Sequence, residues 1–438
     1  MGLASKLLDH WMPADHHAEA LQELLSVYPQ CNFQVRLWDG FVWGTTVNPR
    51  FALILNNPHA LEVMSLCPNE LSLGESYVRG DFEIEGDIEA AFDLADHLFF
   101  HGNAPKRTVA LRQLLRLGVH EEPAQLPPPD LSGALHSHAR DREAVTYHYN
   151  VSSDFYALWL DSRMVYSSAY FERRTDSLET AQRNKLDYLC RKLRLRPGDR
   201  LLDIGCGWGA LAIYAAEFYG AQTLGVTLSE PQAEWARRQI KMRGVGRRCQ
   251  IELLDYRDVS CQRPFDKIVS IGMFEHVGRS NLPKYFECVS RLLRPGGVFL
   301  NSGISYSATY HRKGPSFIDR YVFPDGDLVP ISRALEAAED AGFEVRDLES
   351  AREHYMLTLR HWLARLEQHA AEAHRIAGET IYRLYRIYLA GSAHAFHRGR
   401  LNLYQILLGK RAQGESGLPL TRQDWYAPEK PICLRPAA

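Results

Sequence analysis

Residues 201–212 read LLDIGCGWGALA, in which an apolar run meets three glycines on alternate positions and then a helical pattern. Glycine permits positive φ and lets the backbone approach a ligand closely. In an α/β sheet, ligands bind at the carboxyl ends of the strands, where such a turn lies. The stretch therefore predicts a strand–turn–helix unit that leaves room for a bound molecule against Gly205, Gly207 and Gly209.

Strand and helix patterns alternate along most of the chain from about residue 140. AQTLGVTLS, CQIELLDY, FDKIVSIGM and GGVFLNSG are typical of strands, whereas PQAEWARRQIKMRG and LPKYFECVSRLL are typical of helices. This alternation predicts a parallel sheet covered by helices on both faces, that is, a doubly wound, Rossmann-like α/β fold. A long helical tail is expected from about Tyr355 to Lys410.

The N-terminal part has a different character. FQVRLWDGFVWG and FALILNN are typical of short strands, with a turn at Asp39-Gly40. We therefore expect a small α+β domain over residues 1–104, a linker over 105–140 and the main domain over 141–438. The prolines of LPPPDLSG favour an extended backbone within that linker.

Charge and cysteine usage exclude several classes of protein. A net charge of −2 over 438 residues gives no field that favours nucleic acid, so no nucleic-acid partner is expected. The eight cysteines form no CxxC pair, which argues against a disulfide framework and favours a reducing, cytoplasmic compartment. The N-terminus lacks the pattern of a secretory signal, and no run of eighteen apolar residues predicts a membrane span.

Two pairs of histidines raise the question of a metal. His16 and His17 are adjacent, and His136 and His138 lie in HSHAR. Neither pair has cysteine or carboxylate partners at ligand spacing. We therefore expect solvated histidines and no metal site.

Two kinds of ligand compete for the glycine turn. A dinucleotide fold carries G-x-G-x-x-G with the pyrophosphate on the helix N-terminus, and an acid after the second strand for the ribose. Here the spacing is G-x-G-x-G after Asp203, and no acid ends the second strand. An acid before the turn repels pyrophosphate but suits a cationic group such as an α-ammonium. The pattern disfavours a nicotinamide-dependent oxidoreductase, and a tight turn without a ligand stays an alternative.

DIGCGWGALAIYAA resembles the first motif of class I S-adenosylmethionine (SAM) methyltransferases. More narrowly, residues 143–411 resemble the cyclopropane fatty acid synthase family, and SYVRGDFEIEGDIEAAF resembles the leading domain of its longer members. The matching pieces fall in order: HYNVSSDFYALWLDSRMVYSSAYF, LDIGCGWG, VTLSEPQ, LLDYRD, IGMFEHVG, FIDRYVFPDG, HYMLTLRHW and AHAFHRGRLNLYQ. The resemblance implies a class I methyltransferase fold with a small α+β N-terminal domain and added C-terminal helices. It also implies transfer from SAM to the cis double bond of unsaturated phospholipid acyl chains, giving cyclopropane fatty acids.

The resemblance also implies where SAM is held. The glycine turn would flank its methionine part, and a tyrosine–serine pair would reach it from the segment before the first strand. The stretch after the second strand would hold the ribose hydroxyls, and the stretch after the third would hold the adenine edge. The matching residues are Asp203, Gly205, Gly207, Gly209, Tyr166, Ser167, Thr227, Ser229, Gln232, Asp255 and Tyr256.

An alkene attacks an aligned sulfonium methyl without help from a base, so positioning supplies much of the barrier reduction. The reaction leaves a carbocation on the acyl chain, which needs a dry pocket with π faces or a carboxylate nearby. A proton must then leave the new methyl group before the ring closes. The resemblance implies that a bound bicarbonate takes this proton, held by Glu275 and Tyr355.

Three serines depart from the family pattern. Ser168 and Ser392 each stand where the family usually has cysteine, and Ser302 stands where it has histidine. Ser168 serves the ion mainly through its backbone, whereas the hydroxyl of Ser302 is short and cannot hold a positive charge. Ser168 and Ser302 join Glu275 and Tyr355 as candidate catalytic residues. Two alternatives follow: a methyl-branched or methylene product, or a lipid- or SAM-binding homologue without turnover.

The expected partners follow from the substrate that the resemblance implies. An unsaturated phospholipid requires contact with a membrane surface, so we expect a cytoplasmic protein that associates with membranes peripherally. Members of the family are often dimers, which makes a homodimer an expectation for this chain as well.

Overall fold

The computed structural model describes residues 32–45, 47–66, 69–100, 131–149, 151–260, 262–307 and 316–426, together with Leu25, Tyr28 and Thr309. These residues belong to two compact units. The first unit comprises Met1–Pro128, Arg312–Arg320 and Glu379–His394, and the second comprises Pro129–His311, Tyr321–Gly378 and Ala395–Ala438. The domain boundaries expected at residues 104 and 140 stay predictions.

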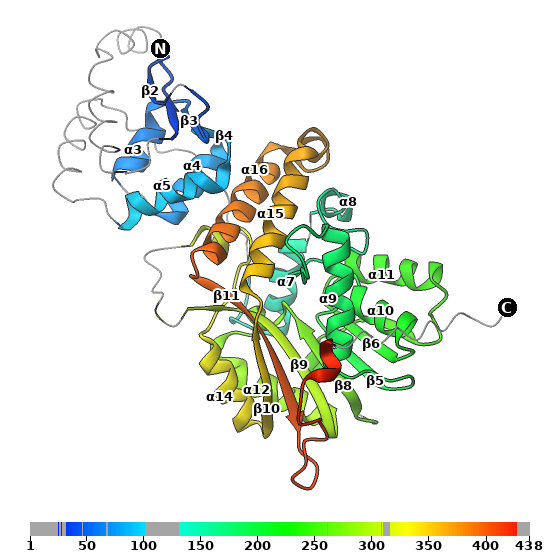
Figure 1. Cartoon of the computed structure of the whole chain (residues 1–438). Coiled ribbons are helices and arrows are strands. Elements are labelled where there is room, and N and C mark those ends of the chain that lie inside the picture. Colours follow the sequence, from blue (N-terminus) through cyan, green and yellow to red (C-terminus); the bar gives the residue numbers. More distant parts are fainter. Residues whose placement is uncertain are drawn as a thin grey trace. The chain divides into compact units, whose positions relative to one another are not determined.

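The first unit contains a four-stranded sheet with the order β2-β1-β3-β4. Strands β1 and β2 form the expected hairpin, and Gly40 takes a φ of 87° in its turn while Phe41 N donates to Asp39 Oδ1. The elements are β1 Gln34–Arg36, β2 Val42–Gly44, β3 Phe51–Leu55, α3 Pro58–Leu66, α4 Glu70–Arg79, β4 Phe82–Gly86 and α5 Ile88–Phe100. The mixture of strands and helices confirms the α+β character predicted for this region (Figure 1).

A distant part of the chain completes the first unit. Helix α16 Ala370–His397 is interrupted at Gly378, where φ is 81°, and its residues 379–394 belong to the first unit. Arg383 and Arg386 are almost fully buried there. Arg386 Nη1 donates to Tyr77 Oη at 2.7 Å, and Arg383 Nη2 donates to the carbonyl of Phe82 at 2.8 Å. These buried arginines fix the helix to α4 and β4.

The second unit contains a seven-stranded sheet with the order β10-β11-β9-β8-β5-β6-β7. Strands β5 to β9 run parallel, and β11 is antiparallel to both β9 and β10. The strands are β5 Arg200–Ile204, β6 Gln222–Thr227, β7 Cys249–Leu253, β8 Phe265–Ile271, β9 Leu293–Tyr306, β10 Phe343–Ser350 and β11 Leu401–Lys410. The chain order reverses beside β5, so the predicted doubly wound α/β fold is confirmed, and ligands are expected at this switch point.

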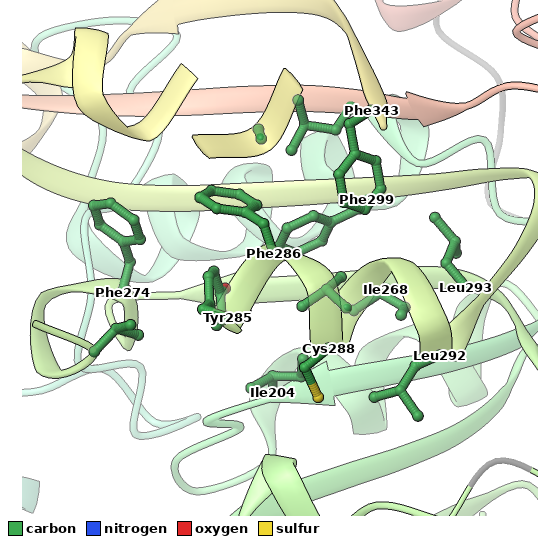
Figure 2. Close-up of a cluster of buried hydrophobic side chains, with 14 of the residues drawn as sticks. Ile204, Ile268, Phe274, Tyr285, Phe286, Cys288, Leu292, Leu293, Phe299 and Phe343 are labelled. Atoms are coloured by element: carbon green, nitrogen blue, oxygen red, sulfur yellow. The ribbon is translucent and has the colours of Figure 1, made fainter. Parts of the chain in front are cut away.

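Helices cover both faces of this sheet (Figure 1). The helices whose residues share core clusters with the strands are α9 Leu178–Lys192, α10 Ala210–Phe218, α11 Glu230–Met242, α12 Leu282–Leu292, α14 Ile331–Asp340 and α17 Gln423–Tyr426. The second unit also contains α7 His138–Tyr149, α8 Ser153–Ala157 and α15 Arg352–Gln368, whereas the short α13 Phe317–Tyr321 belongs to the first unit up to Arg320. Figure 2 shows part of the core, in which Phe286 of α12 lies beside Phe299 of β9 and Phe343 of β10. The core holds the strands rigidly, which fixes the turns at their ends.

The expected helical tail to Lys410 is wrong in its last part. The helices end at His397, Gly399 takes a φ of 71°, and residues 401–410 form the strand β11 inside the sheet. The run LNLYQILLGK is apolar and is buried between β9 and β10. A short apolar run of this kind does not distinguish a buried strand from a buried helix by periodicity.

Candidate active site at the carboxyl ends of the strands

The glycine turn after β5 has the backbone that its sequence predicts. Gly205, Gly207 and Gly209 all have positive φ, at 72°, 54° and 79°. A Cβ at Gly205 would lie 2.8 Å from the Met273 side chain, and one at Gly209 would lie 2.9 Å from Ala236 Cβ. At Gly207 a Cβ would meet nothing within 4 Å. The turn therefore needs glycine for its conformation, and at Gly207 it opens onto free space.

That space belongs to a cavity of about 360 Å³ at the carboxyl ends of the parallel strands. Six of the residues predicted to hold SAM line this cavity: Gly205, Gly207, Thr227, Gln232, Asp255 and Tyr256. Asp203, Gly209 and Ser229 belong to the same strand ends but are not among its lining residues. The structure thus brings the stretches after β5, β6 and β7 to one site.

The stretch after β6 is held by its own hydrogen bonds. Thr227 Oγ1 donates to Gln232 Oε1 at 2.8 Å, and the backbone N–H of Ser229 donates to Thr227 Oγ1 at 3.2 Å. All three residues are buried, and Ser229 is the N-cap residue of α11. The polar atoms of this stretch are therefore fixed in orientation before any ligand binds.

Arg257 is a cavity residue that sequence reasoning missed. Its guanidinium donates to both carboxylate oxygens of Asp255 and to Asp141 Oδ2 at 2.9 Å, and Nη1 donates to the carbonyl of His136 at 3.2 Å. Burial opposes the ionisation of Asp255, but the hydrogen bonds from Arg257 lower its pKa below the ordinary value. Arg257 therefore keeps Asp255 ionised and ties the start of α7 to the cavity wall.

The expectation of solvated histidines is wrong for His136. Its side chain is only 6% exposed and lines the cavity, where it packs directly against Gly278. His138 also lines the cavity but is 55% exposed, which agrees with the expectation. His136 is buried because Arg257 and Asp141 hold its segment against the strand ends, a contact that local sequence does not reveal. His16 and His17 lie outside the described residues.

The tyrosine–serine segment lies between α9 and α15. Tyr166 packs in an aromatic cluster, with its ring centroid 5.3 Å from those of Trp159 and Trp362. Ser167 accepts hydrogen bonds from α9, and the residue after Ser168 donates its backbone N–H to Thr358 Oγ1 of α15 at 2.9 Å. Tyr166, Ser167 and Ser168 are not among the residues that line the cavity.

Glu275 is a buried acid, and one of its carboxylate oxygens has no hydrogen-bond partner among the described residues. It lies in the short helix η2 Phe274–His276, between Met273 and His276, which both line the cavity. Its Oε1 accepts the backbone N–H of Ile304 at 2.8 Å, while its buried Oε2 has no hydrogen-bond partner among the described residues. Burial raises the pKa of Glu275 to about 7, although backbone hydrogen bonds oppose the rise.

Ser302 and Tyr355 lie on other elements at the same edge of the sheet. Ser302 is buried on β9, two residues before the Ile304 that contacts Glu275. Tyr355 is buried on α15, with its ring 4.8 Å from that of Phe396 and 6.1 Å from that of Trp362. The tryptophan in turn contacts Tyr166. Glu275 thus follows β8 and Ser302 lies on the neighbouring β9, whereas Tyr355 lies on α15, which the segment of Tyr166 and Ser168 contacts.

Two buried histidines near the site are neutral at neutral pH. Burial lowers the pKa of His148 to about 3 and that of His276 to about 4. His276 lines the cavity, and the ring of His148 stacks on Tyr166 with centroids 5.7 Å apart. Neutral imidazoles carry no charge that would repel a cationic ligand such as a sulfonium.

The family follows from the comparison with known proteins. The family model described as "Mycolic acid cyclopropane synthetase" matches residues 136–406, which include the cavity and Glu275. The chain belongs to this family. A second model, described only as a domain of unknown function, matches residues 20–97 of the first unit. Members of this family are SAM-dependent methyltransferases, and so is this chain. The family membership therefore excludes the alternative of a nicotinamide-dependent oxidoreductase.

Similar proteins support the assignment to this cyclopropane synthetase family. A probable fatty acid methyltransferase of Pseudomonas putida is 40% identical and aligns over 90% of this chain and 96% of its own. The cyclopropane-fatty-acyl-phospholipid synthase of Escherichia coli is 38% identical over 63% of this chain and 69% of its own. A solved mycolic acid cyclopropane synthase complexed with S-adenosylhomocysteine (SAH) has a TM-score of 0.58 and 35% identity, covering 61% of this chain and 97% of that one.

Two further findings complete the description of this methyltransferase. Among the described residues, no helix combines the length and apolarity needed to cross a bilayer. In the first unit, Asp93, Asp96 and His394 place possible metal-ligand atoms within 4.8 Å of one another, and His394 Nε2 lies 2.7 Å from Asp96 Oδ2. The sequence could not suggest this cluster, because about 300 residues separate His394 from the two aspartates.

Proposed function

We propose that the enzyme transfers the methyl group of SAM to the cis double bond of an unsaturated phospholipid acyl chain and closes a cyclopropane ring. The observation that carries the proposal is Glu275, a buried carboxyl whose Oε2 has no hydrogen-bond partner among the described residues and which lies in the chain between Met273 and His276, two residues that line the cavity. A group of this kind suits the removal of a proton in a water-poor site. The family and its lipid-modifying relatives support the choice of substrate.

The cavity and the strand ends and loop beside it supply groups that suit each part of SAM. The glycine turn lets backbone approach the methionine part, and Asp203 at the end of β5 suits its α-ammonium. The hydrogen-bonded pair Thr227 and Gln232 suits the ribose hydroxyls, and the Tyr256 ring suits the adenine face. Ser167, Gly209 and Ser229 act at this site by shaping the strand ends and the loop before them.

The reaction first requires the alkene to be aligned with the sulfonium methyl group of SAM. The π electrons of the alkene form a bond to the sulfonium methyl carbon while the C–S electrons return to sulfur, which leaves a carbocation on the acyl chain. Tyr166, Trp362 and Tyr355 form a buried aromatic cluster, whose π faces would stabilise a cation on an acyl chain that reaches it. The buried surroundings exclude water, which would otherwise trap the cation.

Glu275 fits a bicarbonate ion that would receive the proton. When bound, bicarbonate would supply the base that takes a proton from the new methyl group. With a pKa near 7, the Glu275 carboxyl carries a proton in part of the molecules at neutral pH and then donates to an anion through its free Oε2. Tyr355 supplies a second hydroxyl donor, Ser302 a shorter one, and Ser168 its backbone.

Ser302 favours a second possible product, in which no cyclopropane ring is closed. Its hydroxyl replaces the histidine usual in the family and reaches less far, which weakens the hold on bicarbonate. The relative from Pseudomonas putida, which aligns over most of both chains, is named a probable fatty acid methyltransferase. If the proton is lost from a neighbouring chain carbon instead, the same carbocation gives a methyl-branched alkene. A 1,2-hydride shift followed by loss of a proton from the methyl group gives a methylene product. Substrate binding by either route places the enzyme at a membrane surface.

The test is incubation of the enzyme with SAM labelled with ¹³C in its methyl group and vesicles of unsaturated phospholipid. NMR of the recovered lipid then distinguishes a cyclopropane carbon from a methyl branch or a methylene. We expect a cyclopropane signal, and Glu275→Gln should lower its rate about 100-fold, because general acid–base assistance is worth at least that much. Label in a methyl branch with an unaffected Glu275→Gln variant would refute ring closure. SAM that binds without any transfer would refute catalysis on this lipid.

A further inference from the structure

Helix α9 sends two buried polar side chains toward the tyrosine–serine segment. Gln182 and Lys185 are 0% and 3% exposed and lie three residues apart, on one face of the helix. Gln182 Nε2 donates to the carbonyl of Ser167 at 2.9 Å, and Lys185 Nζ donates to Ser167 Oγ at 3.0 Å. The helix therefore fixes both the backbone and the side chain of Ser167.

Lys185 is also the positive member of a buried group of charges. Its ammonium interacts electrostatically with Asp161 and Asp203, which are 2% and 3% exposed. Asp161 accepts the backbone N–H groups of Arg163 and Val165, and so holds the turn that precedes Tyr166. Burial lowers the pKa of Lys185 to about 8 and raises that of Asp203 to about 7, and the attraction between the two opposes both shifts.

The direction of the hydrogen bond to Ser167 has a chemical consequence. An ammonium has only donors, so Ser167 Oγ is the acceptor and its own O–H proton is left to donate elsewhere. Asp203, once ionised, is an acceptor only. The Ser167 hydroxyl, which donates, suits the α-carboxylate of an amino acid. The Asp203 carboxylate, which accepts, suits its α-ammonium.

We propose that Lys185 is a positioning residue for the methyl donor, which orients Ser167 to donate to the α-carboxylate of SAM while Asp203 accepts from its α-ammonium. The inference rests on the proposed function, because it takes SAM as the ligand. Lys185 acts through Ser167 and need not contact the donor itself. Its charge also favours the ionised form of Asp203, so the two ends of the amino acid are recognised together.

The test compares two probes on the full-length enzyme by calorimetry: SAH, and its decarboxylated analogue, in which a thiopropylamine chain replaces homocysteine. For Lys185→Met we expect the affinity for SAH to fall about tenfold or more, since a charge-assisted hydrogen bond is lost. The affinity for the analogue should change less than about twofold. Ser167→Ala should give the same selectivity, and the double variant should add nothing to it.

Lys267→Met is the matched control. Lys267 is also buried, and burial also lowers its pKa to about 8, but it lies near the start of β8, away from the carboxyl ends of the strands. We expect this variant to leave the ratio of the two affinities unchanged. If Lys185→Met does not fold, Ser167→Ala and Lys185→Arg provide the same comparison, and the arginine variant should recover part of the affinity because it keeps the charge.

An equal loss of affinity for both probes would show a general structural role for Lys185 and overturn the inference. Full affinity for SAH in Lys185→Met would overturn it as well. A wild-type enzyme that binds neither probe would instead overturn the proposed function, so the two failures are distinguishable.

Discussion

Burial raises the pKa of both Asp203 and Glu275 to about 7. Burial penalises their charged forms, and each folded-state pKa therefore lies above that of the unfolded chain. An acid with a raised pKa holds its proton more tightly when folded, so the free energy of unfolding falls as the pH rises toward 7. The same property leaves a proton on Glu275 where the proposed reaction needs a donor.

Glu275→Gln is predicted to stabilise the enzyme relative to the wild type as the pH rises. The wild-type acid titrates at about 7 when folded and near 4.5 when unfolded. The variant's advantage should therefore grow between about pH 5 and pH 7, toward about 3 kcal/mol. Urea unfolding of both proteins across this range measures the difference, with the exposed Glu252→Gln as the control. A difference that does not depend on pH would contradict a raised pKa.

Gly207 and Gly244 form a natural pair for testing the cavity. Both have positive φ, and at neither would a Cβ meet anything within 4 Å, but only Gly207 lines the cavity. Alanine at either position should cost about 1 kcal/mol of stability through backbone strain. Only Gly207→Ala should also weaken SAH binding, by about tenfold or more, as calorimetry would measure. Equal SAH affinities in the two variants would place the donor elsewhere.

At the scale of elements, α16 and β11 determine how the C-terminal part of the chain is used. Residues 379–394 of α16 complete the first unit, while β11 lies inside the sheet of the second. Arg386 donates to Tyr77 Oη, to the carbonyl of Ile84 and to Glu83, all in the first unit. The helix is therefore part of the core of the first unit.

Arg386→Met should destabilise the first unit by about 3 kcal/mol, because it removes a buried cation and leaves its acceptors without their donor. Arg375→Met, on the same helix, is the control, since Arg375 is 69% exposed and pairs only with Glu372 among the described residues. Thermal unfolding followed by circular dichroism measures both. Equal melting temperatures would show that the buried arginine contributes nothing to the unit.

The sequence predicts those parts of this site that depend on local backbone. The glycine turn and the stretches after β6 and β7 carry their own motifs, so the residues that line the cavity there could be predicted. The burial of His136 and the role of Arg257 could not, because both depend on contacts between segments about 120 residues apart. Strand β11 was missed for a different reason, since its apolar run fits a buried helix as well as a buried strand.

At the scale of the whole molecule, the chain passes back and forth between the two units. Each unit is made of three separate segments of the sequence. The family match covers the second unit's sheet except for the last residues of β11, which lie beyond residue 406. The domain of unknown function covers most of the described part of the first unit, up to residue 97. Peripheral contact with a membrane and assembly into a homodimer stay proposals for this enzyme. The first rests on the phospholipid substrate that we propose, and the second on the resemblance to the family.

The most direct measurement uses SAM with a fully deuterated methyl group and two sets of vesicles, one of unsaturated and one of saturated phospholipid. Mass spectrometry of the released acyl chains then counts the deuterium atoms. We predict deuterium only in the unsaturated chains, with one of the three atoms lost as the ring closes. Deuterium in neither lipid, or deuterium in the head group, would contradict methyl transfer from this cavity to an acyl double bond.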